Sequence, residues 1–175
     1  RITSWKGQLE FIDVIKKIDT QNILVLFAGD TKNESYTKLV RDKIKQNSLE
    51  GVCKILGRVN QDEMRSLYQI ADLSVSFPLQ AEGFGRTVSE SLYSKTPVLA
   101  FDYGGVKNQL ADLSEIFKVK PQDFIGLPAK IEKLLSLSDD QKKEALEGVQ
   151  SFIERDFSKT NMANQYLKLY ESVKS

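Results

Sequence analysis

Short apolar runs alternate with segments of helical periodicity along this chain, and that alternation restricts the fold more than any other feature. The runs are rich in branched and aromatic side chains, as strands buried in a parallel sheet are. The predicted strands span residues 23–28, 52–56, 73–77, 98–101 and 116–119. Strands that alternate with helices in this way indicate an α/β fold with a doubly wound, Rossmann-like parallel sheet.

Apolar residues recur at helical spacing between these strands, around residues 9–18, 36–44 and 64–68. After the last strand the pattern is mostly helical, so we expect extra C-terminal helices. These are predicted near residues 122–137, 140–155 and 158–173. In the last one, Ser158 is suited to cap the N-terminus. The spacing of Met162, Tyr166, Leu169 and Tyr170 predicts that they point inward.

Composition limits the chemistry available to the chain. Its 175 residues are enough for one domain with a real core and too few for two ordinary ones, so we expect one domain over residues 1–175. Lysine and arginine total 25 against 24 acids, and the net charge of +1 argues against nucleic acid as a partner. The single cysteine, Cys53, lies in an apolar run, which predicts a core residue in a reducing compartment.

The absence of histidine from the sequence excludes Ser-His-Asp and Cys-His catalysis. The sequence has no clustered metal-ligand spacing, so we expect neither a metal nor a cofactor. Any chemistry must use carboxylates, cations and backbone dipoles. The longest apolar stretch, residues 23–28, is far shorter than the ~20 residues of a membrane span, and we expect a cytoplasmic protein.

One motif concentrates the functional signal: Glu82-Gly-Phe-Gly-Arg-Thr-Val-Ser-Glu90, between a predicted strand and a helix that starts near Thr87. In parallel sheets such turns lie where ligands bind, and a helix N-terminus there offers unpaired N–H groups. Gly83 and Gly85 let the backbone come close to a ligand. The Glu90 carboxylate suits two adjacent ribose hydroxyls. The alternatives are a solvent-facing glutamate near a helix start and, for Glu82, an ordinary turn glutamate.

The ordered set of motifs resembles the C-terminal, donor-binding domain of retaining GT-B glycosyltransferases, in the large family four. Besides the two glutamates with seven residues between them, the similar pieces include a cation pair near the start and a later double glycine. They are Arg1 with Lys6-Gly7, Phe27–Asp30, Ile55–Val59, Leu67–Asp72, Pro97-Val98 and Gly104-Gly105. Each motif alone is weak evidence for the resemblance. The evidence becomes strong because the motifs occur together in the order that the family has. Asn108 departs from the family's glutamate after the double glycine.

The resemblance implies a role for each matching residue. Glu82 would contact the transferred sugar and the charge at its anomeric carbon, and it is the candidate catalytic residue. We do not assign it as nucleophile, because paired glycosidase carboxylates flank one bond at ~5–5.5 Å. Glu90 would bind the ribose, and the cations would bind the diphosphate. The expected donor-binding residues are Arg1, Lys6, Val59, Gly83, Phe84, Gly85, Arg86, Thr87, Glu90, Gly104 and Gly105. For Val59 an ordinary strand-end role stays open, as does an ordinary tight turn for the double glycine.

The resemblance also implies a substrate and partners. We expect a UDP- or GDP-sugar donor, hexose transfer to a glycan or lipid-linked acceptor, and a role in cell-surface polysaccharide biosynthesis. Catalysis would need an N-terminal GT-B domain, which can bring the enzyme to the inner face of the membrane. Residues 1–7 read as a loop where a doubly wound sheet normally has a strand, so we expect a fragment that is inactive alone. The alternatives are a non-catalytic subunit of a split transferase and a GT-B nucleotide-sugar epimerase.

Overall fold

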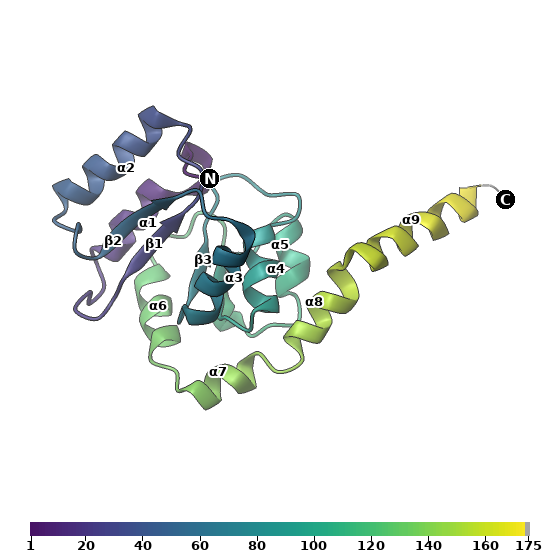
Figure 1. Cartoon of the computed structure of the whole chain (residues 1–175). Helices are drawn as coiled ribbons and strands as arrows, with labels where there is room; N and C mark the ends of the chain where they lie inside the picture. The colour runs from purple at the N-terminus through teal and green to yellow at the C-terminus, as the bar shows by residue number, and fades with distance from the viewer. Residues whose placement is uncertain (174–175) are drawn as a thin grey trace.

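The computed structural model describes residues 1–173, in which parallel strands alternate with helices (Figure 1). Two short 3-10 helices, η1 (Ser4–Lys6) and η2 (Glu115–Phe117), accompany them. The strands are β1 (Val25–Ala28), β2 (Cys53–Gly57), β3 (Ser74–Ser76), β4 (Val98–Phe101) and β5 (Lys118–Val119). The helices are α1 (Gln8–Ile15), α2 (Glu34–Gln46), α3 (Gln61–Ile70), α4 (Arg86–Tyr93), α5 (Gly105–Leu110), α6 (Leu127–Leu135), α7 (Asp139–Ala145), α8 (Val149–Phe157) and α9 (Lys159–Val173). The predicted α/β class with parallel strands is confirmed.

The strands pair in two separate parts. β1 pairs with β2, and β3 pairs with β4, which in turn pairs with β5. Residues 1–7 link the two parts at the carboxyl ends of the strands: the Ile2 N–H donates to the Asp30 carbonyl at 2.9 Å, and the Leu79 N–H donates to the Trp5 carbonyl at 2.7 Å. This segment is a loop with a 3-10 turn, as the sequence predicted for residues 1–7, and it is not a strand of either part.

Burial follows the strand pairing. Every residue of β4, which has a neighbour on each side, is buried, whereas β1 and β3 contain half-exposed residues. Cys53 at the start of β2 is 4% exposed, so its predicted place in the core is confirmed. Burial raises the pKa of its thiol to about 11, which keeps it neutral at pH 7.

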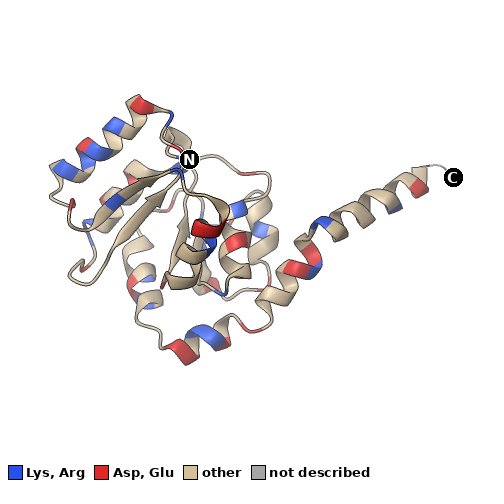
Figure 2. Ribbon diagram, in the orientation of Figure 1, with Lys and Arg blue, Asp and Glu red and all other residues tan. Residues whose placement is uncertain are grey.

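The helices form two groups, one around α1 and one around α4. The first helix contacts α2 and α6, and α4 contacts α3, α5 and α8. Charged residues lie mainly on these helices and in the loops, with both signs mixed (Figure 2). Within the strands of the described chain, Lys54 and Lys118 are the only charged residues, as expected for elements whose faces are covered.

The C-terminal helices differ from the prediction in two ways. The helix expected over 140–155 is two helices, because Gly148 adopts a left-handed conformation with φ of 73° between α7 and α8. The inward orientation predicted for α9 is wrong. Met162, Tyr166, Leu169 and Tyr170 are 55% to 63% exposed, because α9 contacts α8 and then extends away from the rest of the protein (Figure 1). The predicted cap is confirmed: the Asn161 N–H donates to Ser158 Oγ at 3.1 Å.

This exposure makes α9 a weak contributor to stability. None of its described residues is buried, and removing exposed residues usually changes the free energy of unfolding by about 0.5 kcal/mol or less. We therefore expect a chain ending at Ser158 to keep a free energy of unfolding, measured by urea denaturation, within about 0.5 kcal/mol of the wild-type value. A loss of several kcal/mol would show that α9 packs on the body in solution.

Candidate functional site

Loops from several strands meet at the carboxyl ends of β3 and β4. The predicted motif begins in the connection between β3 and α4 and continues into α4, and Gly104-Gly105 follows β4. The Gly105 N–H donates to the Glu82 carbonyl at 2.9 Å. Adjacent parallel strands bring these two loops together, although some 20 residues of sequence separate them.

The double glycine faces the motif loop itself. A Cβ on Gly104 would lie 2.5 Å from the Glu82 carbonyl oxygen, and one on Gly105 would collide with the Gly83 carbonyl. The lack of a side chain at these two positions therefore allows the two backbones to pack together. Gly85, at φ 78°, is packed instead against the Val106 side chain. Gly83 differs, since a Cβ there meets nothing within 4 Å.

The N-terminus of α4 opens onto this edge. Gly85 is its N-cap and provides no side-chain cap. Among the described residues, no hydrogen bond is made by the backbone N–H groups of Gly85, Arg86 and Thr87. Unpaired N–H groups at the positive end of a helix favour an anion, and a phosphate is the usual one.

Lys6 and Glu82 form an ion pair next to this helix end. Their side chains are only 23% and 12% exposed, and the Lys6 ammonium lies 4.4 Å from the centre of the Trp5 ring. Glu82 Oε2 is buried and has no hydrogen-bond partner among the described residues. One carboxylate oxygen of Glu82 thus holds the lysine, and the other is a buried acceptor without a partner among the described residues.

Glu90, in the second turn of α4, is held from two sides. Arg86 donates to Oε1 through Nη2 at 2.7 Å and Nε at 3.2 Å, and the Tyr68 hydroxyl donates to Oε2 at 3.4 Å. Burial raises the pKa of Tyr68, and the Glu90 charge raises it further, partly offset by a hydrogen bond from Thr87. Tyr68 is therefore neutral at pH 7 and can donate.

Two further side chains hold the loops. Gln109, fully buried on α5, donates to the Phe84 carbonyl, and the Tyr103 hydroxyl donates to the Pro78 carbonyl. Burial raises the pKa of Tyr103, and the nearby charge of Glu82 adds to the effect. The Phe84 ring contacts Phe157 of α8, with 5.8 Å between ring centres. This contact supports the loop from the side.

Sequence reasoning missed Tyr68, Tyr103 and Gln109. Tyr68 was interpreted as part of an apolar helix face, and its buried ring agrees with that. A tyrosine on such a face still needs a partner for its hydroxyl, and this was the available signal. Nothing local to Gln109 indicated its contact with Phe84, which is 25 residues away.

The remaining predicted residues lie at the same ends of the strands. The Arg1 carbonyl accepts from Gln8 Nε2 at 2.9 Å, and the Arg1 side chain is exposed. Val59 is half-buried between the end of β2 and Asn60, the N-cap of α3. The structure thus joins Lys6 to Glu82, and the glutamate loop to the double glycine. Among the described residues, no contact gives Val59 a role.

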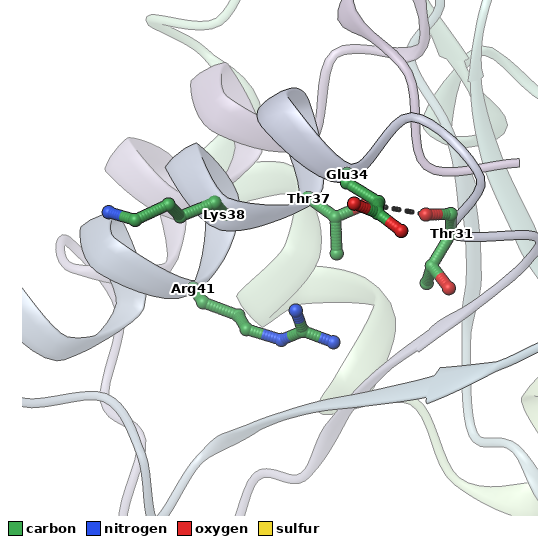
Figure 3. Close-up of a pocket in the computed structure, with 5 residues that line it drawn as sticks. All are labelled: Thr31, Glu34, Thr37, Lys38 and Arg41. Atoms are coloured by element: carbon green, nitrogen blue, oxygen red, sulfur yellow. Dashed lines mark hydrogen bonds between the residues drawn. The ribbon is translucent and has the colours of Figure 1, made fainter.

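Surface hollows lie elsewhere. One of about 420 Å³ is lined by residues before and on α2, with Lys38 and Arg41 extending from the helix and Thr37 bonded to the Thr31 carbonyl at 3.4 Å (Figure 3). Another, of about 540 Å³, includes Ala71 and Pro97, which precede β3 and β4. Neither of these two hollows contains a predicted site residue.

Comparison with known proteins identifies the family. Residues 1–148 match the sequence profile described as Glycosyl transferases group 1. The chain belongs to this family. It is 28% identical over 181 aligned positions to the trehalose synthase of Thermococcus litoralis, an alignment that covers 98% of this chain and 42% of the relative. The chain therefore spans less than half the length of that curated relative.

Solved structures agree on the fold. A glycosyltransferase from Rickettsia africae matches with a TM-score of 0.88 and 29% identity, over 99% of this chain and 46% of the other. Anabaena HepE, solved with UDP and glucose, matches with a TM-score of 0.84 and 24% identity, over 98% of this chain and 46% of the HepE chain. The C-terminal domain of a Francisella tularensis group 1 glycosyl transferase matches with a TM-score of 0.75 and 21% identity. This match covers 91% of this chain and 83% of the other. The chain thus corresponds to the C-terminal GT-B domain, as the motifs predicted.

The described residues contain neither a cluster suited to a metal ion nor a helix suited to a membrane. In residues 1–173, no group of three or more histidine, cysteine, aspartate or glutamate side chains is placed to hold a metal ion. Across the same residues, no helix combines the length and apolarity needed to cross a bilayer.

Proposed function

We propose that this chain is the donor-binding domain of a retaining glycosyltransferase that takes a hexose from a UDP- or GDP-sugar. The observation that carries the proposal is the grouping of a cation, two glutamates and an unpaired helix N-terminus at one sheet edge. Lys6 and the N–H groups of α4 suit a diphosphate. The buried, unpartnered oxygen of Glu82 can accept a hydrogen bond from a sugar hydroxyl, and the Glu90 carboxylate suits the ribose. The UDP complex of HepE supports the choice of nucleotide.

Catalysis in this proposal depends on charge. As the glycosidic bond breaks, negative charge grows on the leaving diphosphate and positive charge grows at the anomeric carbon. Lys6, with Arg1 and the amides of Gly85 to Thr87, would stabilise the negative charge on the diphosphate. The carboxylate of Glu82 would stabilise the positive charge at the anomeric carbon. No step in this scheme requires a metal or a covalent intermediate on the protein.

The acceptor side is proposed to lie outside this chain. The chain spans 42% to 46% of the full relatives cited above, and the hexose acceptor would be a glycan or a lipid-linked sugar in cell-surface polysaccharide synthesis. We place residues 1–175 in one donor-binding domain and expect this domain alone to bind nucleotide without measurable transfer. Cytoplasmic localisation and docking to an N-terminal domain belong to the same proposal.

Nucleotide binding by Glu90→Ala tests the assignment. Hydrogen bonds to a charged group contribute ~1.5–3 kcal/mol, so we expect UDP or GDP affinity to fall at least tenfold. Isothermal titration calorimetry measures this, and Glu132→Ala, at an exposed position of α6, should leave the affinity unchanged. Absence of UDP and GDP binding at millimolar ligand would contradict the proposal, as would wild-type affinity in Glu90→Ala.

A further inference from the structure

The two groups that hold Glu90 differ in how firmly they are fixed. Arg86 lies one turn earlier on the same helix, and its side chain is 75% exposed. A long exposed side chain retains rotamer freedom, and such a pair is worth little in stability. Tyr68 comes from another helix, α3, and is 9% exposed. Glu90 is therefore held at Oε1 by a flexible partner and at Oε2 by a fixed one.

The position of Tyr68 is set by a buried network. The Thr96 hydroxyl donates to the Tyr68 carbonyl at 2.6 Å, and the Ser91 hydroxyl donates to the Thr96 carbonyl at 3.1 Å. Thr96 and Ser91 are buried, and Ser91 is on α4, the helix that carries Glu90. This network joins the end of α3 to α4. The tyrosine hydroxyl is thus held in place relative to the backbone of Glu90.

We propose that Tyr68 is a positioning residue that orients the Glu90 carboxylate for the two ribose hydroxyls of the donor. The inference rests on the proposed function, in which Glu90 binds the ribose. A carboxylate has about four acceptor positions. Tyr68 occupies one of them, on Oε2, so the ribose can displace Arg86 from Oε1 while the tyrosine keeps the plane of the carboxylate fixed.

The electrostatics agree with this role. The tyrosine hydroxyl stays protonated at physiological pH because burial and the Glu90 charge raise its pKa. A neutral donor holds the carboxylate without neutralising it, so Glu90 keeps the charge that strengthens its bonds to hydroxyls. Arg86 offsets this charge by pairing with Oε1, and a ribose hydroxyl that binds Oε1 must compete with it.

Tyr68→Phe tests the proposal because it removes one oxygen and keeps the buried ring. UDP and 2′,3′-dideoxyuridine diphosphate, which lacks both ribose hydroxyls, are titrated against each variant. In the wild type we expect UDP to bind at least tenfold more tightly. In Tyr68→Phe we expect UDP to weaken about fivefold, while the dideoxy compound keeps its affinity. In Glu90→Ala, adding Tyr68→Phe should change UDP affinity less than twofold.

Controls separate the possible failures. Tyr36→Phe removes the hydroxyl of another buried tyrosine, on α2, and should bind both nucleotides as the wild type does. Wild-type protein that binds neither nucleotide, or both equally, refutes the proposed function, and this inference falls with it. If the wild type and Tyr68→Phe both prefer UDP over the dideoxy compound by the same factor, the role of Tyr68 is refuted and the proposed function is not. Equal weakening of both nucleotides also refutes it, because it shows a general structural effect.

Discussion

Replacing Gly105 with alanine is expected to destabilise the protein by about 2–4 kcal/mol and to abolish measurable nucleotide binding. The added Cβ would collide with the Gly83 carbonyl oxygen, and it would lie 2.6 Å from the Gly83 carbonyl carbon and 2.8 Å from the Phe84 Cα. All three atoms are backbone, so no side-chain rotation relieves the overlap. The glutamate loop must move as a unit, and the hydrogen bond from the Gly105 N–H to Glu82 is lost with it.

The same loop supplies the control. Gly83→Ala places a Cβ in open space without a left-handed φ, so we expect its urea midpoint to stay close to that of the wild type. Urea unfolding monitored by circular dichroism gives the stabilities, and UDP titration gives the affinities. A Gly105→Ala variant within about 0.5 kcal/mol of the wild type would show that the two loops do not pack as described.

Replacing Lys6 with methionine is expected to weaken UDP binding more than tenfold and to cost about 1–3 kcal/mol of stability. The stability effect arises because Glu82, 12% exposed, keeps its charge and loses its cation, and an unpaired buried charge is expensive. The binding effect arises because the diphosphate loses a charge-assisted contact. Uridine, which has no phosphate, should bind Lys6→Met as it binds the wild type.

A double variant separates these two effects. Lys6→Met with Glu82→Gln removes both charges, so the stability should recover most of the loss while UDP affinity stays low. Differential scanning calorimetry and calorimetric titration of the three proteins measure the pattern. If Lys6→Met bound UDP with wild-type affinity, the assignment of Lys6 to the phosphate site would be wrong. Failure of the double variant to regain stability would show that Lys6 supports the structure through Trp5, which its ammonium also contacts.

Local patterns were sufficient for the five strands and for the place of the motif. All five strands lie within or close to the predicted ranges, and α4 begins at Arg86, one residue before the predicted start. Such features depend on side-chain periodicity over a few residues, which the sequence displays directly. The helix break at Gly148 was missed because one glycine in a helical pattern does not reveal its φ. The exposure of α9 was missed because periodicity shows an apolar face without showing what covers it.

The sequence by itself determined the α/β class, the family resemblance and the candidate glutamates. Only the tertiary structure decided how those glutamates are held: Glu82 by Lys6, which is 76 positions away, and Glu90 by Tyr68, which is 22 positions away. It also showed that Gly104 and Gly105 face another loop. The physical reason is that these contacts depend on which strands are neighbours in the sheet. Strand order is a property of the whole chain's packing, and no local segment of sequence contains it.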